Sequence, residues 1–185
     1  MAVEKEQNAQ ALGKIAEPLL KWYSKNARIL PWRERPEPYR VWVSEIMLQQ
    51  TRVEAVKPYY ERFLSALPSI AALAEAPEEQ LLKLWEGLGY YSRVRNLQKA
   101  AQKVMQEYGG ALPASYEQLK SLPGIGEYTA GAIASIAFGI AVPVVDGNVL
   151  RVVSRITGRS LQDAVVGLFL RGETSLDELI PLLNY

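Results

Sequence analysis

The chain has 185 residues, enough for one helical domain or two small lobes, and its 21 Lys and Arg residues nearly balance its 20 Asp and Glu residues. The net charge of +1 gives no overall signal for a polyanion partner, so evidence for nucleic-acid binding must be local. The sequence contains neither Cys nor His, which excludes disulfides, thiol catalysis, cysteine-ligated clusters and His-dependent triads built from these residues. Carboxylates, Tyr, Lys and Arg remain as the chemical groups.

Apolar residues recur at three- and four-residue spacing along most of the chain, and strand-like alternation is nearly absent. The pattern predicts an all-α fold with helices, in chain order, near 16–27, 40–51, 53–66, 77–86, 92–108, 115–121, 127–138 and 147–157. The segment after about residue 160 allows two short helices and carries no chemical motif. The polar amino terminus lacks a signal-like core, and no stretch has the length of a membrane span, so we expect a cytoplasmic protein.

The sharpest local motif is LPGIG at 122–126, between two predicted helices. Gly124 and Gly126 allow backbone conformations closed to other residues, so the turn can be tight and its amides can approach a ligand closely. The next helix begins at Glu127, and its unpaired amides with the positive end of the helix dipole suit a DNA phosphate. A plain helix-helix turn with a glycine cap explains the same spacing equally well.

Glu45 lies in VWVSEIMLQQ, a predicted helix that is apolar on nearly every face. We expect its carboxyl to be desolvated, which raises the pKa and suits a general acid working near neutral pH. The alternative is a buried Glu paired with Arg33 or Arg52 for structural reasons alone.

Asp146 precedes a predicted helix and fits the N-cap position, which by itself is a structural role. A carboxylate at a helix start is also favoured in its ionised form, which suits a group that faces a developing cation. A neutral acid and an ionised carboxylate together form the pair that breaks a glycosidic bond through an oxocarbenium-like transition state.

Five segments in order resemble the adenine DNA glycosylases of the helix-hairpin-helix (endonuclease III) superfamily: LPWR at 30–33, VSEIMLQQTRV at 43–53, WEGLGYYSRVRNL at 85–97, LPGIGEYTAGAI at 122–133 and VVDGNVLRVVSR at 144–155. The resemblance covers roughly residues 17 to 158. It implies a six-helix, barrel-like lobe over 28–138 that contains the helix-hairpin-helix. It further implies a second helical lobe built from 1–27 and 139–185.

The resemblance also implies roles for the catalytic candidates. Glu45 would protonate a flipped adenine mispaired with 8-oxoguanine or guanine, and Asp146 would stabilise the deoxyribose cation or bond to it transiently. Tyr128 would lie near the sugar, and Asn148 would orient water or Asp146. Lyase-active relatives carry a Lys two residues after the last hairpin glycine, where this chain has Tyr128, so we expect a monofunctional glycosylase.

The remaining implied roles concern duplex DNA, the expected partner of a monomeric, nucleoid-associated protein. Gln50 and Tyr90 would wedge into the base stack, and Arg33 would lie along the adenine pocket. The backbone of Leu122, Gly124 and Gly126 would form the hairpin that holds a phosphate. For each of these residues, packing or a surface contact is the structural alternative.

The chain departs from the family pattern after about residue 159. Typical members continue to four Cys that ligate a four-iron four-sulfur cluster, and many add a domain that helps recognise 8-oxoguanine. This sequence has no Cys, so we expect no cluster and no metal site. Because the resemblance stops near residue 159, we also expect a shortened second lobe. Two other functions remain open: a catalytically silent DNA-binding fragment, and a glycosylase for another mismatched base such as thymine. A purely structural helical protein is the weakest alternative, because it leaves the combination of motifs unexplained.

Overall fold

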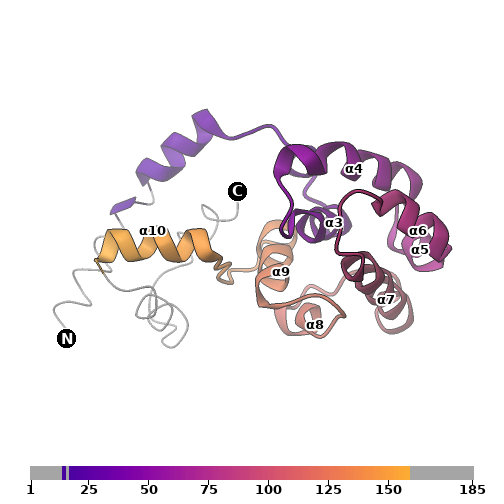
Figure 1. Ribbon diagram of the computed structural model, residues 1–185. Coiled ribbons are helices and arrows are strands. Elements are labelled where there is room, and N and C mark those ends of the chain that lie inside the picture. Colours follow the sequence, from indigo (N-terminus) through magenta and orange to yellow (C-terminus); the bar gives the residue numbers. More distant parts are fainter. Residues whose placement is uncertain (1–13, 16, 159–185) are drawn as a thin grey trace. The chain divides into compact units, whose positions relative to one another are not determined.

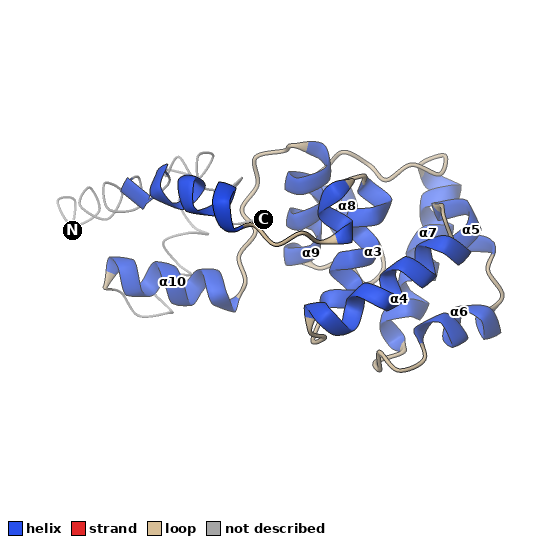
Figure 2. Cartoon of the chain, turned by 90° about the horizontal axis from the view of Figure 1, so that it is seen from above, coloured by secondary structure: helices blue, strands red, loops and turns tan. Residues whose placement is uncertain are grey.

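The computed structural model describes residues 14–15 and 17–158 (Figure 1). All regular elements in this part are helical, which confirms the expected all-α fold class (Figure 2). The two short helices expected after residue 160 lie outside the described residues. Within the described ranges, no helix combines the length and the apolar character that crossing a bilayer requires. The chain divides into two compact units: a larger one, Ile29–Ile140, and a smaller one, Met1–Arg28 with Ala141–Tyr185.

The larger unit contains helices α2 (Pro31–Glu34), α3 (Pro38–Leu48), α4 (Val53–Ala66), α5 (Ile70–Glu75), α6 (Glu78–Trp85), α7 (Ser92–Glu107), α8 (Tyr116–Lys120) and α9 (Glu127–Ala132), followed by the π-helix η1 (Ile133–Ala137). The sequence pattern predicted most of these within two residues and missed two short helices, α2 and α5. It also predicted one helix over 127–138, where the structure changes from α to π geometry at Ile133.

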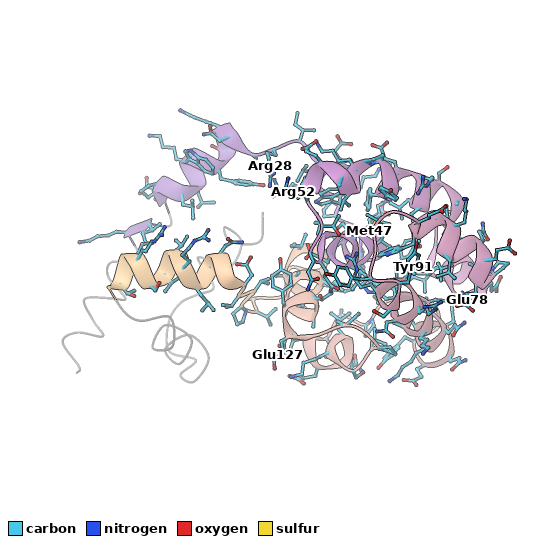
Figure 3. The ribbon with its side chains drawn as sticks, viewed as in Figure 1. Arg28, Met47, Arg52, Glu78, Tyr91 and Glu127 are labelled. Carbon is cyan, nitrogen blue, oxygen red and sulfur yellow. The ribbon has the colours of Figure 1, made fainter. Side chains whose placement is uncertain are left out.

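Helix α3 is the centre of the larger unit, in contact with α2, α4, α7, α9 and η1 (Figure 1). Trp42, Val43 and Met47 are completely buried, and Figure 3 shows Met47 in the interior of the unit. This central place explains why the helix is apolar on nearly every face, since a helix surrounded by others has no solvent side. A polar side chain on α3 is therefore unusual, and Glu45 is such a residue.

Aromatic contacts hold the helices around α3. The rings of Phe63 on α4 and Trp85 on α6 meet edge to face with centroids 6.0 Å apart, and those of Trp32 and Tyr60 meet in the same way at 5.4 Å. Such pairs contribute about 1 kcal/mol each beyond the area that they bury. The Trp85 contact fixes the end of α6, from which the chain turns towards Tyr90.

In the smaller unit, residues 17–26 are helical and helix α10 spans Gly147–Thr157. The start of α10 agrees with the predicted one. The helix is followed by Gly158, whose φ of 67° gives the left-handed conformation common at helix C-termini. Val152 and Ile156 on α10 are 46% and 39% exposed.

Candidate functional site

Glu45 sits on the central helix α3, and only part of its surface reaches solvent. Burial raises the pKa of its carboxyl from 4.5 to about 7. A hydrogen bond from Tyr128 and the positive charge of Arg33 act in the opposite direction, and burial outweighs both. The carboxyl is therefore about half protonated at neutral pH, which is what a general acid requires. A Glu held as an anion in an ordinary ion pair would instead have a lowered pKa and would be ionised at neutral pH.

Tyr128 lies in the first turn of α9, and 42% of its surface is exposed. Its hydroxyl hydrogen-bonds Glu45, so one part of the side chain reaches the acid while another faces solvent. The structure thus brings together three of the predicted site residues, Glu45, Tyr128 and Arg33, from α3, α9 and α2. The sequence did not predict a second contact, made by the residue that follows Tyr128: Gln49 Nε2 donates a hydrogen bond to Thr129 Oγ1 over 3.4 Å.

The predicted hairpin is present between α8 and α9. Gly124 has a φ of +75°, and a Cβ there would lie 2.8 Å from Cβ of Asn96, so this position requires glycine on two counts. Gly126 is the N-cap of α9, and no side chain caps the helix there. The first amides of α9 therefore remain available to a ligand, as the phosphate-binding interpretation requires.

One detail of the hairpin differs from the expectation. Gly126 has a φ of −87° and a ψ of −177°, an extended conformation open to any residue, so its backbone does not need glycine. No other atom lies within 4 Å of a Cβ built at Gly126, so glycine keeps this corner of the turn open. The side chain of Leu122 is buried in the core, which leaves only its backbone for contact with DNA.

The two predicted wedge residues share an unusual backbone. Gln50, after the end of α3, has a φ of 56°, and Tyr90, between α6 and α7, has a φ of 47°. No other non-glycine residue in the described ranges has a positive φ. Both side chains are exposed, that of Tyr90 at 64% of its surface. Strained, exposed positions of this kind persist only where neighbouring groups hold them, and they concentrate at functional sites.

In the smaller unit, Asp146 caps α10. Its Oδ1 accepts hydrogen bonds from the amides of Asn148 (2.9 Å) and Val149 (2.8 Å), and its Oδ2 accepts one from Asn148 Nδ2 (2.9 Å). Arg151 in turn donates to the Asn148 side chain over 2.9 Å. The predicted N-cap is confirmed, and the orienting role of Asn148 stays a prediction. Three donors fix the direction of the carboxylate while the residue remains partly exposed.

The four-iron four-sulfur cluster that the resemblance implies for typical family members requires Cys thiolates. The 185 residues include no Cys, so they do not provide this ligand set.

The family model described as "HhH-GPD superfamily base excision DNA repair protein" matches residues 43–164. The adenine DNA glycosylase of Homo sapiens is 53% identical over 147 residues, which cover 75% of this chain and 27% of that protein. The adenine DNA glycosylase of Buchnera aphidicola subsp. Baizongia pistaciae is 46% identical over 138 residues, covering 74% of this chain and 39% of that protein. The chain therefore spans well under half the length of these relatives.

Solved structures share the fold. A thermostable thymine-DNA glycosylase superposes with a TM-score of 0.81 at 26% sequence identity, covering 97% of this chain and 86% of that chain. Endonuclease III in a non-covalent complex with DNA superposes with a TM-score of 0.74 at 22% identity, covering 95% and 84% of the two chains.

Proposed function

Because this chain belongs to the HhH-GPD superfamily of base excision DNA repair proteins, as its motifs had indicated, we propose that it hydrolyses the N-glycosidic bond of adenine mispaired with guanine or 8-oxoguanine. The choice of adenine is supported by curated relatives between 41% and 53% identical that are all named adenine DNA glycosylase. The observation that carries the chemistry is Glu45, a carboxyl on a buried helix with a pKa of about 7.

In the proposed reaction, protonated Glu45 donates its proton to a ring nitrogen of adenine. The base then departs as a neutral molecule, and the electron pair of the N-glycosidic bond leaves with it. Tyr128 orients the carboxyl through its hydrogen bond and keeps an exposed face for the sugar. General-acid assistance of this kind contributes about 10² to 10⁴ in rate.

Departure of the base leaves positive charge on the deoxyribose, and we assign its stabilisation to Asp146. The carboxylate is suited to the role because three hydrogen bonds already fix its orientation, so little reorganisation is needed as charge develops. Water then adds to the sugar, and the proton that it releases returns to the ionised Glu45, which completes hydrolysis and restores the acid. Asn148 supports this step by holding one oxygen of Asp146.

The product should be an intact abasic strand. A lyase needs an amine that attacks the sugar and forms a Schiff base, and this chain has the phenol of Tyr128 at the position where lyase-active relatives have Lys. Treatment with borohydride should therefore trap no covalent adduct between the protein and DNA.

Duplex binding is assigned to two features of the larger unit. The uncapped N-terminus of α9 would hold one phosphate, and the exposed side chains of Gln50 and Tyr90 would fill the space left by the departing base. Unstacking the base costs a few kcal/mol, which these contacts must offset.

The substrate is tested by incubating the chain with four duplexes that differ in one pair: adenine opposite 8-oxoguanine, guanine or thymine, and thymine opposite guanine. We expect release of adenine from the first two duplexes only. Binding of all four without release of any base would identify a DNA-binding protein without glycosylase activity, and no duplex binding would contradict the proposal entirely.

Thymine is the second candidate substrate, because the thymine-DNA glycosylase structure superposes on nearly the whole chain. Preferential release of thymine from the pair with guanine would favour it over adenine.

A further inference from the structure

Arg93, near the start of α7, lies between the two turns that carry Gln50 and Tyr90. Each of these turns holds an L residue in the left-handed region, which costs roughly 1 kcal/mol or more per residue. Neighbouring groups must therefore hold the two turns in place.

The Nη1 atom of Arg93 binds the first turn. It donates to the carbonyl oxygens of Ile46 (3.0 Å) and Met47 (3.2 Å) and to that of Gln49, the residue before Gln50. Ile46 and Met47 belong to the last turn of α3, where carbonyls lack partners within the helix. The guanidinium supplies those partners and places a positive charge at the negative end of the helix dipole.

The Nη2 atom of the same guanidinium binds the second turn. It donates to the carbonyl oxygens of Leu88 (3.0 Å) and Gly89 (3.2 Å), the two residues before Tyr90. The guanidinium carbon also lies 5.6 Å from the ring centroid of Tyr90 and 5.4 Å from that of Trp85. One planar group thus joins the end of α3 to the turn that follows α6.

We propose that Arg93 is a positioning residue that holds the Gln50 and Tyr90 turns together, so that both side chains enter the base stack as one unit when the target base leaves it. The proposal rests on the proposed base excision, for which extrusion of the base is required. Arg93 is itself partly buried, and its terminal nitrogens are engaged with the protein, so it does not act as a surface contact for phosphate.

The geometry demands arginine. The two terminal nitrogens of a guanidinium point in fixed, different directions, whereas the three donors of a lysine radiate from a single nitrogen. Arg93→Lys keeps the charge, but its three donors on one nitrogen cannot keep all five carbonyl contacts of the guanidinium. Arg95 supplies the matched control, because it lies on the same helix, is exposed, and pairs with Glu78 over 2.9 Å at the surface.

The test compares Arg93→Lys with Arg95→Lys by three measurements. Amide hydrogen exchange reports on residues 49–51 and 88–91. The fluorescence of 2-aminopurine, placed opposite guanine in a duplex, reports extrusion at saturating protein. Affinity for a duplex with a tetrahydrofuran abasic site reports binding that needs no extrusion.

For Arg93→Lys we expect faster exchange in both turns together and about a tenfold lower extent of extrusion, since hydrogen bonds from a charged donor are lost. Affinity for the abasic duplex should stay within about threefold, because phosphate contacts are unaffected. Arg95→Lys should match the wild type in all three.

Unchanged exchange in either turn, or equal losses on both duplexes, would overturn the proposal. If the wild-type chain extrudes and releases no base, the proposed function fails, and the exchange of the two turns still decides whether Arg93 couples them.

Discussion

The Tyr128 hydroxyl donates a hydrogen bond to the Glu45 carboxyl and thereby joins the first turn of α9 to the central helix α3. This bond favours the ionised form of Glu45, while burial favours the protonated form and prevails. The acid strength of the site is therefore a balance between a tyrosine and a hydrophobic environment.

Tyr128→Phe should move the alkaline limb of the pH-rate profile to higher pH. Glu45 acts in its protonated form, so the wild-type second-order rate constant for adenine release should fall about tenfold per pH unit above about 7. Loss of the hydrogen bond removes a contact that lowers the pKa, so the limb should shift upwards by up to about one pH unit. A shift to lower pH would contradict the direction assigned to this contact.

Glu45→Gln should stabilise the fold at alkaline pH. The folded-state pKa of about 7 lies above the usual 4.5, so the folded chain binds more protons than the unfolded chain between these values and loses stability as pH rises through them. Above pH 7 the ionisation of buried Glu45 lowers the free energy of unfolding by about 3 kcal/mol at most. Glutamine does not ionise, so the variant does not lose this stability.

Thermal melts of wild type and Glu45→Gln at pH 5 and pH 8 measure this effect. The variant should melt higher at pH 8, and the difference should shrink towards pH 5. Glu54→Gln, in which an exposed carboxylate paired with Lys57 is neutralised, is the control and should change stability by less than about 1 kcal/mol. A Gln variant less stable than the wild type at pH 8 would contradict the burial of Glu45.

The two hairpin glycines should differ in what they tolerate. Gly124→Ala places a Cβ in the left-handed region and 2.8 Å from Asn96 Cβ, so the free energy of unfolding should fall by about 1 to 3 kcal/mol. Gly126→Ala meets no atom within 4 Å and keeps an ordinary φ, so stability should change by less than about 0.5 kcal/mol.

Urea melts and duplex titrations separate these effects. Gly126→Ala should weaken duplex binding several-fold despite its unchanged stability, because the new methyl group lies where a phosphate would approach the α9 amides. Undiminished affinity in Gly126→Ala would count against the hairpin as a phosphate site.

The capping and chemical roles of Asp146 can be separated by two substitutions. Asparagine is as good an N-cap as aspartate, so Asp146→Asn should keep α10 stable while it removes the carboxylate. Asp146→Ala loses the acceptor as well, at a cost of about 1 kcal/mol. Adenine release should be lost in both, with lower helix content by circular dichroism in the alanine variant only. Undiminished adenine release by Asp146→Asn would show that Asp146 only caps α10 and has no chemical role.

Local patterns predicted much of this fold because they contain its physical causes. The amphipathic repeat of α4 predicted its limits, Val53–Ala66, without error, and the apolar pattern of α3 predicted the raised pKa of Glu45. Helix α5 (IAALAE) was missed because nearly all of its residues are apolar and show no helical period, although Ser69 caps it through a 3.1 Å bond from the amide of Ala72.

Other parts of the site depend on tertiary contacts and could not be predicted from local sequence patterns. Arg93 hydrogen-bonds residues 44 to 47 positions away in the chain and others only four or five away, and no sequence pattern indicates that these two groups meet. The positive φ of Gln50 and Tyr90 likewise follows from how their turns are held. The expectation for Gly126 was wrong because glycine there provides space, and the spacing of two glycines does not distinguish space from backbone freedom.

In the proposed reaction, Glu45 is the acid and Asp146 the stabilising carboxylate for release of adenine. The first measurement is single-turnover release from a duplex with adenine opposite 8-oxoguanine, using wild type, Glu45→Gln, Asp146→Asn and the control Glu54→Gln. We predict equal release by wild type and Glu54→Gln, at least about a hundredfold slower release by the other two, and strand breakage only after alkali. Release that persists undiminished in Glu45→Gln would contradict the account.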